Sequence, residues 1–134
     1  MLTETLLANN LRRIRPGGSS CHRESFRSFV HPVPGREDEF NEWYDNVHIP
    51  ELLAVPGMVS ATRYALHEAA IYHVKGGVVP EHKYMCVYEL EGDVDEIMGK
   101  IRQRVASGEL HMSDSLDLST SRLSFWTSGK AFQA

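Results

Sequence analysis

The order of strand-like and helix-like segments constrains the fold of this chain more than any other feature of its sequence. Four short segments read as strands from their alternation or their content of aromatic and β-branched residues, and Pro34-Gly35 closes the first with a turn. These segments are Glu24–Val33, Met58–His67, His82–Leu90 and Ser121–Thr127. Two segments with helical spacing separate them, so the predicted order is β-α-β-β-α-β. This order predicts an α+β fold, a ferredoxin-like, split β-α-β antiparallel sheet with both helices on one face.

The first helical segment has apolar residues at i, i+3, i+4 and i+7 and acidic residues on its other side. The apolar stripe consists of Phe40, Trp43, Tyr44 and Val47. Because a residue that precedes proline disfavours helical geometry, Pro50 predicts a kink at Ile49, just after His48. A short turn over Glu51–Ala54 is expected to follow, before Val55-Pro56-Gly57 ends the segment.

The second helical segment is expected to begin at Asp93, a suitable N-cap residue, and to end at Ser107-Gly108. Its apolar residues at helical spacing are Val94, Ile97, Met98, Ile101 and Val105. The stretch Glu68–Glu81 contains Gly76-Gly77 and Pro80, so we predict a loop between the second and third strands.

One face of such a sheet would remain uncovered in a single chain. The strands carry large apolar or aromatic side chains on both faces, and we expect Tyr84, Tyr88 and Phe125 on the uncovered face. A monomer would then expose more apolar surface than the few hundred Å² that soluble monomers usually tolerate. Pairing of two copies removes this exposure, so the sequence predicts a homodimeric α+β barrel around an apolar pocket.

The length of 134 residues suits one domain with a core of ordinary size, which we assign to residues 21–134. Residues 1–20 are predicted to be an appendage, flexible or helical, because leucines at near-helical spacing precede the breaker run Pro16–Ser20. Hydrophobic residues make up 42% of the chain and charged residues 24%, a balance typical of globular proteins.

The charge pattern argues against nucleic acid as a partner, because the net charge is −4 and the 14 Lys and Arg residues form no long stripe. No apolar run approaches the roughly 18 residues needed to span a bilayer, and the first residues lack the apolar stretch of a signal peptide. Cys21 and Cys86 show no CxxC or zinc-type spacing. We therefore expect a reduced, cytoplasmic protein with neither a nucleic-acid nor a membrane partner.

The densest group of chemically useful residues is Glu39–Glu51, an acidic and aromatic helix that carries His48 near its expected kink. An unperturbed imidazole has a pKa of about 6.5, so this side chain can give or take a proton near neutral pH. The spacing also permits a simpler interpretation. In it, His48 caps the last helix carbonyls, and Trp43 and Tyr44 only pack in the core.

The segment PGREDEFNEWYDNVHIPELLAVPGMVSATRY, residues 34–64, resembles the dimeric α+β barrel proteins of the EthD-like kind. The strand HKYMCVYEL and the later segment SGELHMSDSLD support the resemblance, which covers residues 25–130. Relatives in this superfamily include muconolactone-type isomerases, small-molecule cyclases and cofactor-free monooxygenases. The resemblance implies that His48, Trp43 and Tyr44 border a pocket bounded by the sheet.

A second polar group, Glu109–Ser115, follows the second helical segment. Within it, His111 and Asp114 can form an imidazole and carboxylate pair in which the acid fixes the tautomer of the ring. An exposed loop is the alternative interpretation of this group.

Several strand side chains can bind a carbonyl or phenol of a ligand if they face the barrel. These are Arg63, Tyr64, Tyr84 and Tyr88. Their position in the sequence does not tell which face lies inside. His48 and Glu51 have an H-x-x-E spacing, but no second histidine completes a metal motif, so we expect no metal.

Together these features predict cofactor-independent acid/base chemistry, by a lyase, isomerase or cyclase, on a small hydrophobic aromatic or lactone-like metabolite of a catabolic pathway. His48 would be the general acid or base, Tyr44 and His111 would polarise the substrate oxygen, and Trp43 would cover the apolar rings. Arg63, Tyr64, Tyr84 and Asp114 would bind the substrate. Two alternatives remain open: a non-catalytic carrier or accessory protein with the same pocket, and a monooxygenase that acts with or without haem.

Overall fold

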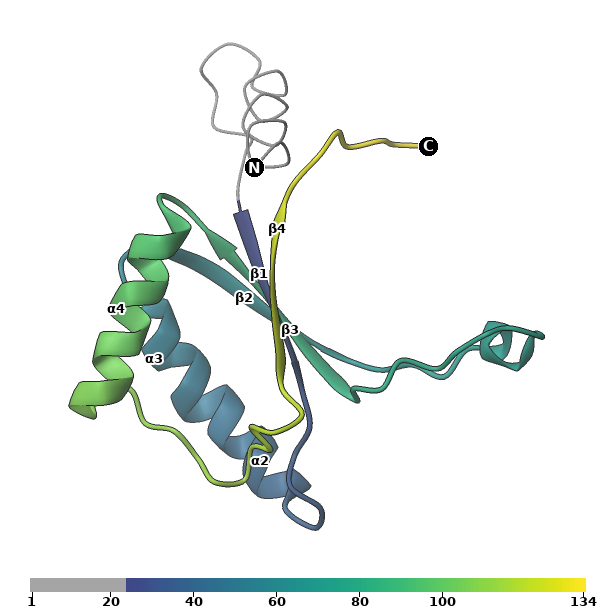
Figure 1. Cartoon of the computed structure of the whole chain (residues 1–134), viewed down its shortest axis with the longest axis horizontal. Helices are drawn as coiled ribbons and strands as arrows, with labels where there is room; N and C mark the ends of the chain where they lie inside the picture. Colours follow the sequence, from purple (N-terminus) through teal and green to yellow (C-terminus); the bar gives the residue numbers. More distant parts are fainter. Residues whose placement is uncertain (1–23) are drawn as a thin grey trace.

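The computed structural model describes residues 24–134, apart from the side chains of residues 71 and 72. This part of the chain forms a four-stranded antiparallel sheet with its helices on one face (Figure 1). The strands are β1 (Glu24–Val30), β2 (Met58–Ala65), β3 (Tyr84–Leu90) and β4 (Arg122–Thr127). Their spatial order, β2-β3-β1-β4, is that of a ferredoxin-like sheet and confirms the predicted fold class. The predicted appendage, residues 1–20, lies outside the described residues.

The first helix is continuous, although its hydrogen-bond pattern changes along it. It consists of α2 (Glu37–Trp43), a π-helical turn over Tyr44–His48 and α3 (Ile49–Leu53). The predicted kink at Ile49 is wrong, because this residue keeps helical angles, with φ −62° and ψ −49°. Its N–H donates to the carbonyl of Tyr44, five residues earlier, as in a π-helix. The wider turn leaves room for the ring of Pro50, which would crowd the backbone of an ordinary α-helix.

The second helix, α4 (Val94–Ser107), has the limits that the sequence predicts. The side chain of Asp93 accepts a hydrogen bond of 2.9 Å from the N–H of Glu96, as an N-cap residue does. Gly108 ends the helix with a φ of 84°, a left-handed conformation that favours glycine.

The core lies between the sheet and the two helices. Alternate residues of β1 and β3 are buried there, together with residues of the first helix and of the segment after α4. The buried apolar side chains are those of Phe26, Val30, Phe40, Tyr44, Leu52, Val55, Met58, Cys86, Tyr88, Leu90, Ile97, Leu110 and Leu116.

The prediction that Tyr84, Tyr88 and Phe125 lie on the uncovered face is wrong. Phe26 pairs with Tyr88 in the register of β1 with β3, and with Phe125 in the register of β1 with β4. Its ring stacks on both partners, with centroids 5.0 and 5.3 Å apart. Tyr84 shares the parity of Tyr88 along β3, so all of these side chains point to the helices.

The opposite face of the sheet nevertheless exposes large side chains, which come from the other parity of each strand. Tyr64 is 49% exposed and Trp126 is 52% exposed. Half-buried side chains of the central strands lie between them, namely Phe29, Met85 and Val87. The guanidinium of Arg27 lies 5.6 Å from the centroid of the Trp126 ring. This face thus exposes large apolar side chains, as predicted, and also carries the cationic Arg27.

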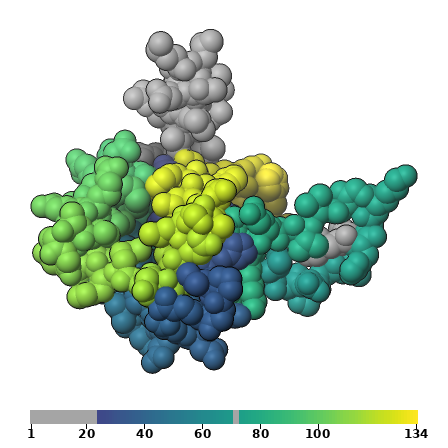
Figure 2. All heavy atoms as spheres, turned by 60° about the horizontal axis from the view of Figure 1, so that its bottom comes forward, coloured from purple at the N-terminus to yellow at the C-terminus, as the bar shows by residue number. Residues whose placement is uncertain are grey.

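The connection between β2 and β3 projects from the body of the molecule as a long arm (Figures 1 and 2). It contains the predicted loop Glu68–Glu81 and holds one 3-10 turn, over Ala70–His73. Its glycines and prolines extend the hairpin away from the helices, so the arm contributes nothing to the core described above.

Candidate active site between the sheet and the helices

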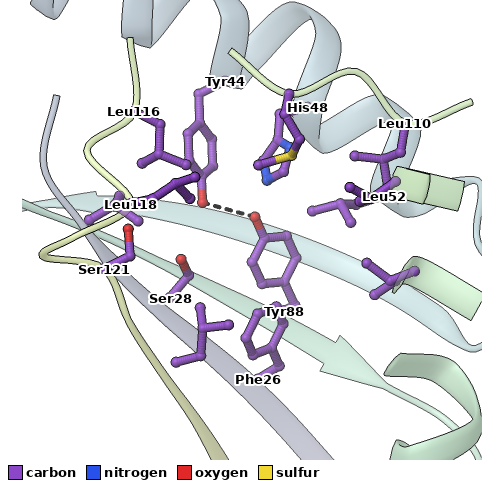
Figure 3. A pocket seen from close by; sticks show the side chains of 15 residues that line it. Phe26, Ser28, Tyr44, His48, Leu52, Tyr88, Leu110, Leu116, Leu118 and Ser121 are labelled. Atoms are coloured by element: carbon purple, nitrogen blue, oxygen red, sulfur yellow. Dashed lines mark hydrogen bonds between the residues drawn. The ribbon is translucent and has the colours of Figure 1, made fainter. Parts of the chain in front are cut away.

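A cavity of about 340 Å³ lies between the sheet and the helices, on the same side as the core (Figure 3). Its volume falls in the range of small-molecule sites, about 300 to 1,000 Å³. Most of its wall is aliphatic or aromatic. The residues that line it are Phe26, Ser28, Val30, Tyr44, His48, Leu52, Tyr88, Ile101, Val105, Leu110, Met112, Leu116, Leu118, Ser121 and Leu123.

The segment between α4 and β4 forms one wall of this cavity and is fixed to the end of β1 by backbone hydrogen bonds. The N–H of Val33 donates to the carbonyl of Ser115 over 2.7 Å, and the N–H of Asp117 donates to that of His31 over 3.0 Å. These bonds hold the intervening chain against the sheet. Leu116 and Leu118 of this segment lie beside Tyr44 in the cavity wall (Figure 3).

The polar end of the cavity is formed by two phenols from different layers. The hydroxyl of Tyr44, on the first helix, and that of Tyr88, on β3, lie 3.0 Å apart, within hydrogen-bond distance (Figure 3). Burial raises the pKa of both phenols, and most strongly that of Tyr88. Both groups are therefore uncharged at neutral pH. The hydroxyl of Ser28 faces the same region from β1.

His48 lies beside these phenols in the wall of the cavity (Figure 3). Its Nδ1 is buried and has no hydrogen-bond partner among the described residues. Burial lowers the pKa of His48 to about 4, and the carboxylate of Glu51 opposes this change only in part. The imidazole is therefore neutral at pH 7. The alternative role as a helix cap is not seen, because the helix continues to Leu53 and the His48 side chain makes no cap hydrogen bond.

Trp43 does not line the cavity, but its ring packs against the imidazole of His48. The rings of Trp43 and His48 stack with centroids 4.5 Å apart, and those of His48 and Tyr44 form a T-shaped pair with centroids 4.9 Å apart. The indole Nε1 of Trp43 donates a hydrogen bond of 3.0 Å to the carbonyl of His111. This bond fixes the indole and, through stacking, the plane of the imidazole.

His111 and Asp114 do not form the predicted pair. Nδ1 of His111 lies 2.9 Å from the carboxylate of Glu51, and the carboxylate of Asp114 lies 2.7 Å from the guanidinium of Arg36. Both side chains are exposed, and neither lines the cavity. Each side chain has another partner instead. His111 contacts Glu51 of α3, and Asp114 contacts Arg36, which precedes α2.

Arg63 lies next to the cavity and packs against the ring of Tyr44. Its guanidinium is 4.5 Å from the centroid of the Tyr44 ring. It also donates hydrogen bonds to Asp45, over 2.9 Å, and to Asn41, over 2.8 Å. These contacts place Arg63 in a positioning role, although it does not reach the cavity.

The two remaining predicted binding residues lie away from the cavity. The hydroxyl of Tyr84 donates to Glu37 and accepts from the amide of Asn41, at the start of the first helix. Tyr64 lies on the opposite face of the sheet, half exposed. Sequence reasoning gave no role to Ser28 or Ser121, whose small side chains carry no pattern of their own. Tyr88 was predicted to lie on the uncovered face, because alternation alone does not show which face the helices cover.

Within residues 24–134, no three His, Cys, Asp or Glu side chains are grouped so that they could hold a metal ion. Of the described residues that line the cavity, His48 is the one with a nitrogen that can ligate a metal-bearing cofactor. In the same part of the chain, no helix is long and apolar enough to cross a membrane.

Solved structures similar to this chain have the same fold. An EthD family protein from Bacillus halodurans C-125 matches with 18% sequence identity and a TM-score of 0.52, over 82% of this chain and 99% of that one. A proposed monooxygenase from Shewanella loihica PV-4 matches with 14% identity and a TM-score of 0.50, over 87% of this chain and 100% of that one. No family model matches the sequence. No curated protein matches it either. The predicted resemblance is confirmed at the level of the fold: this chain has the ferredoxin-like α+β fold of an EthD family protein.

Proposed function

We propose that this chain is an enzyme that moves a proton on a small, uncharged hydrophobic molecule bound in the cavity, without a cofactor. The observation that carries the proposal is the neutral imidazole of His48 in the wall of the cavity, beside the hydroxyls of Tyr44 and Tyr88. A hydroxyl, a carbonyl or an acidic C–H group of a ligand in the cavity can approach this ring.

The two phenols provide the electrostatic part of the reaction. One hydrogen bond between Tyr44 and Tyr88 uses one of their two O–H groups, so the other O–H can donate to an oxygen of the ligand. Because burial raises the pKa of both groups, they remain donors at neutral pH. A substrate carbonyl bound there would be polarised while the neutral His48 accepts a proton from the neighbouring carbon.

The wall of the cavity supports an uncharged, hydrophobic substrate. Its lining is mostly aliphatic and aromatic, and the ionisable groups in it are held in their uncharged forms. A charged ligand would lose its hydration without gaining a counter-ion there, at a large cost in free energy. An aromatic or lactone-like molecule suits this lining, and its conversion would be an isomerisation, a cyclisation or a lyase cleavage.

A non-catalytic carrier is the second candidate, and one observation favours it. The pKa of His48 is lowered to about 4, so the imidazole is a weaker base than one with a pKa near the working pH. In a carrier, His48 would only accept a hydrogen bond from the ligand hydroxyl. The same cavity serves both functions.

The replacement His48→Ala separates the two candidates. Binding of hydroxylated aromatic compounds and aromatic lactones would be followed by calorimetry, and their conversion by NMR. For an enzyme, the variant should bind within about tenfold of the wild type while turnover falls at least about a hundredfold. His31→Ala, which lies outside the cavity wall, is the matched control and should keep full turnover. Ligands that bind the wild-type protein but stay unchanged would overturn the enzyme proposal in favour of the carrier.

We also propose that two copies of this chain pair through the uncovered face of the sheet. Tyr64 and Trp126 are about half exposed there, with half-buried apolar residues between them. Such a face lowers its free energy when a second sheet covers it. The cavity lies on the other side of the sheet, so each copy would keep a complete site.

A further inference from the structure

A long apolar groove of about 630 Å³ lies between α4 and β4, next to the cavity. Three residues, Phe26, Ile101 and Leu123, line both the cavity and the groove. The other residues of the groove are Glu24, Val94, Asp95, Met98, Arg102 and Phe125. The groove and the proposed substrate site therefore adjoin each other at these three residues.

The groove lies along β4, an edge strand whose helix-side residues are only partly covered. Leu123 and Phe125 point to the helix side, yet they are 60% and 47% exposed. On α4, Ile97 is the one fully buried residue, and Met98 and Ile101 are only partly buried against the core. Apolar side chains on both sides of the groove are therefore open to a ligand.

The uncharged hydrogen-bonding side chains of the combined site belong to the cavity, whereas the groove is lined by apolar side chains together with the charged Glu24, Asp95 and Arg102. Tyr44, Tyr88 and His48 line the cavity and not the groove, whereas Met98 and Phe125 line the groove and not the cavity. A molecule that filled both hollows would need an oxygen at one end and an apolar tail at the other.

We propose that the substrate is such an elongated amphiphile, with an aromatic or lactone head and an apolar tail; this inference rests on the proposed function. Its head lies at the Tyr44 and Tyr88 hydroxyls, and its tail passes Leu123 into the groove between α4 and β4. Each methylene group that leaves water on binding contributes about 0.8 kcal/mol, which is about fourfold in Kd. The tail thus supplies affinity, while the head carries the chemistry.

Calorimetry with 4-alkylphenols tests this proposal on the full-length chain. The probes are 4-methylphenol, 4-butylphenol and 4-octylphenol, each kept below its micellar concentration. We expect Kd to fall with each added methylene group, by up to about fourfold, until the groove is filled. A Kd that does not depend on tail length would overturn the proposal, and would leave the groove to a second copy or to another segment of the chain.

The variant Phe125→Asp places a charge in the groove at a residue that does not itself line the cavity, and Phe125→Leu, which also removes the stacking on Phe26, is its matched control. Phe125→Asp should bind 4-methylphenol within about twofold of the wild type but lose at least about tenfold in affinity for 4-octylphenol, while Phe125→Leu keeps both. Equal loss for both probes, or none for either, would overturn the proposal. If no bound compound is converted, the proposed function is overturned. The proposal for the groove is not, because it is tested by the dependence of Kd on tail length.

Discussion

The hydroxyl of Tyr44 on the first helix and that of Tyr88 on β3 lie 3.0 Å apart and join the two layers of the fold at the polar end of its cavity. This contact has a structural role and a proposed catalytic one. Both phenols are buried, so each depends on the other for a hydrogen bond, with Ser28 as a further partner of Tyr44 and Cys86 as a further partner of Tyr88. The pair should therefore respond to substitution as a unit.

Replacing either tyrosine by phenylalanine should reveal this dependence. Tyr44→Phe or Tyr88→Phe leaves a buried hydroxyl that has lost a partner, which should lower the free energy of unfolding by about 1–3 kcal/mol. The double variant leaves neither hydroxyl, so its loss should be smaller than the sum of the two single losses, by about 1 kcal/mol. Urea unfolding of the four proteins measures this difference. Losses that simply add would show that the two hydroxyls do not interact.

The stability of the protein should depend on pH through His48. Its pKa is about 4 in the folded chain and 6.5 ordinarily, so between these pH values the unfolded state binds a proton that the folded state does not. The free energy of unfolding should therefore fall as the pH drops from about 6.5 to 4, by up to about 3 kcal/mol.

The variant His48→Gln isolates this contribution from the other titrating groups. Urea unfolding at a series of pH values should give a shallower decline for the variant than for the wild type across that range. Parallel curves would mean that His48 is solvated in the folded protein.

An alanine at Gly57 should destabilise the protein more than an alanine at Gly35, and the comparison separates a steric clash from backbone strain. Both Gly57 and Gly35 have positive φ, 99° and 81°, so alanine strains the backbone at either position by about 1–2 kcal/mol. Only at Gly57 would the new Cβ also lie 2.6 Å from the buried side chain of Ile97. Gly57→Ala should therefore destabilise the protein by about 1–3 kcal/mol more than Gly35→Ala, measured by urea unfolding. Equal losses would show that α4 moves aside freely.

The uncovered face of the sheet should mediate dimer formation. Light scattering should give twice the mass of one chain at micromolar concentration. Trp126→Lys places a charge in that face and should yield a monomer. Leu53→Lys, on α3 in the opposite layer, is the control and should remain dimeric. If Trp126→Lys also stays dimeric, the copies pair through another surface.

Features set by local interactions were predicted from the sequence with good accuracy. The order of the elements follows from hydrophobic spacing, and the limits of α4 follow from the N-cap at Asp93 and from Gly108. These signals lie within a few residues of the structure that they specify. The position of His48 beside a pocket was expected from the resemblance to EthD-like proteins, and the structure places it in the cavity wall.

Features that depend on contacts between distant segments could not be obtained in this way. Alternation along β3 groups Tyr84 with Tyr88, but it does not say which face the helices cover. Similarly, Asp114 is close to His111 in sequence, yet it pairs with Arg36, which is 78 positions away. The continuation of the helix past Ile49 was missed because the rule for residues before proline assumes an α-helix and not a π-helical turn.

The π-helical turn over Tyr44–His48 also has an evolutionary consequence. Such a turn is equivalent to one extra residue inserted in an α-helix, and each residue rotates the next part of the helix by about 100°. Deleting one residue there would remove the wider turn and rotate the imidazole relative to Tyr44, while the sheet and its order stayed intact. The gain or loss of a single codon is therefore enough to bring a histidine into this cavity or to take it out.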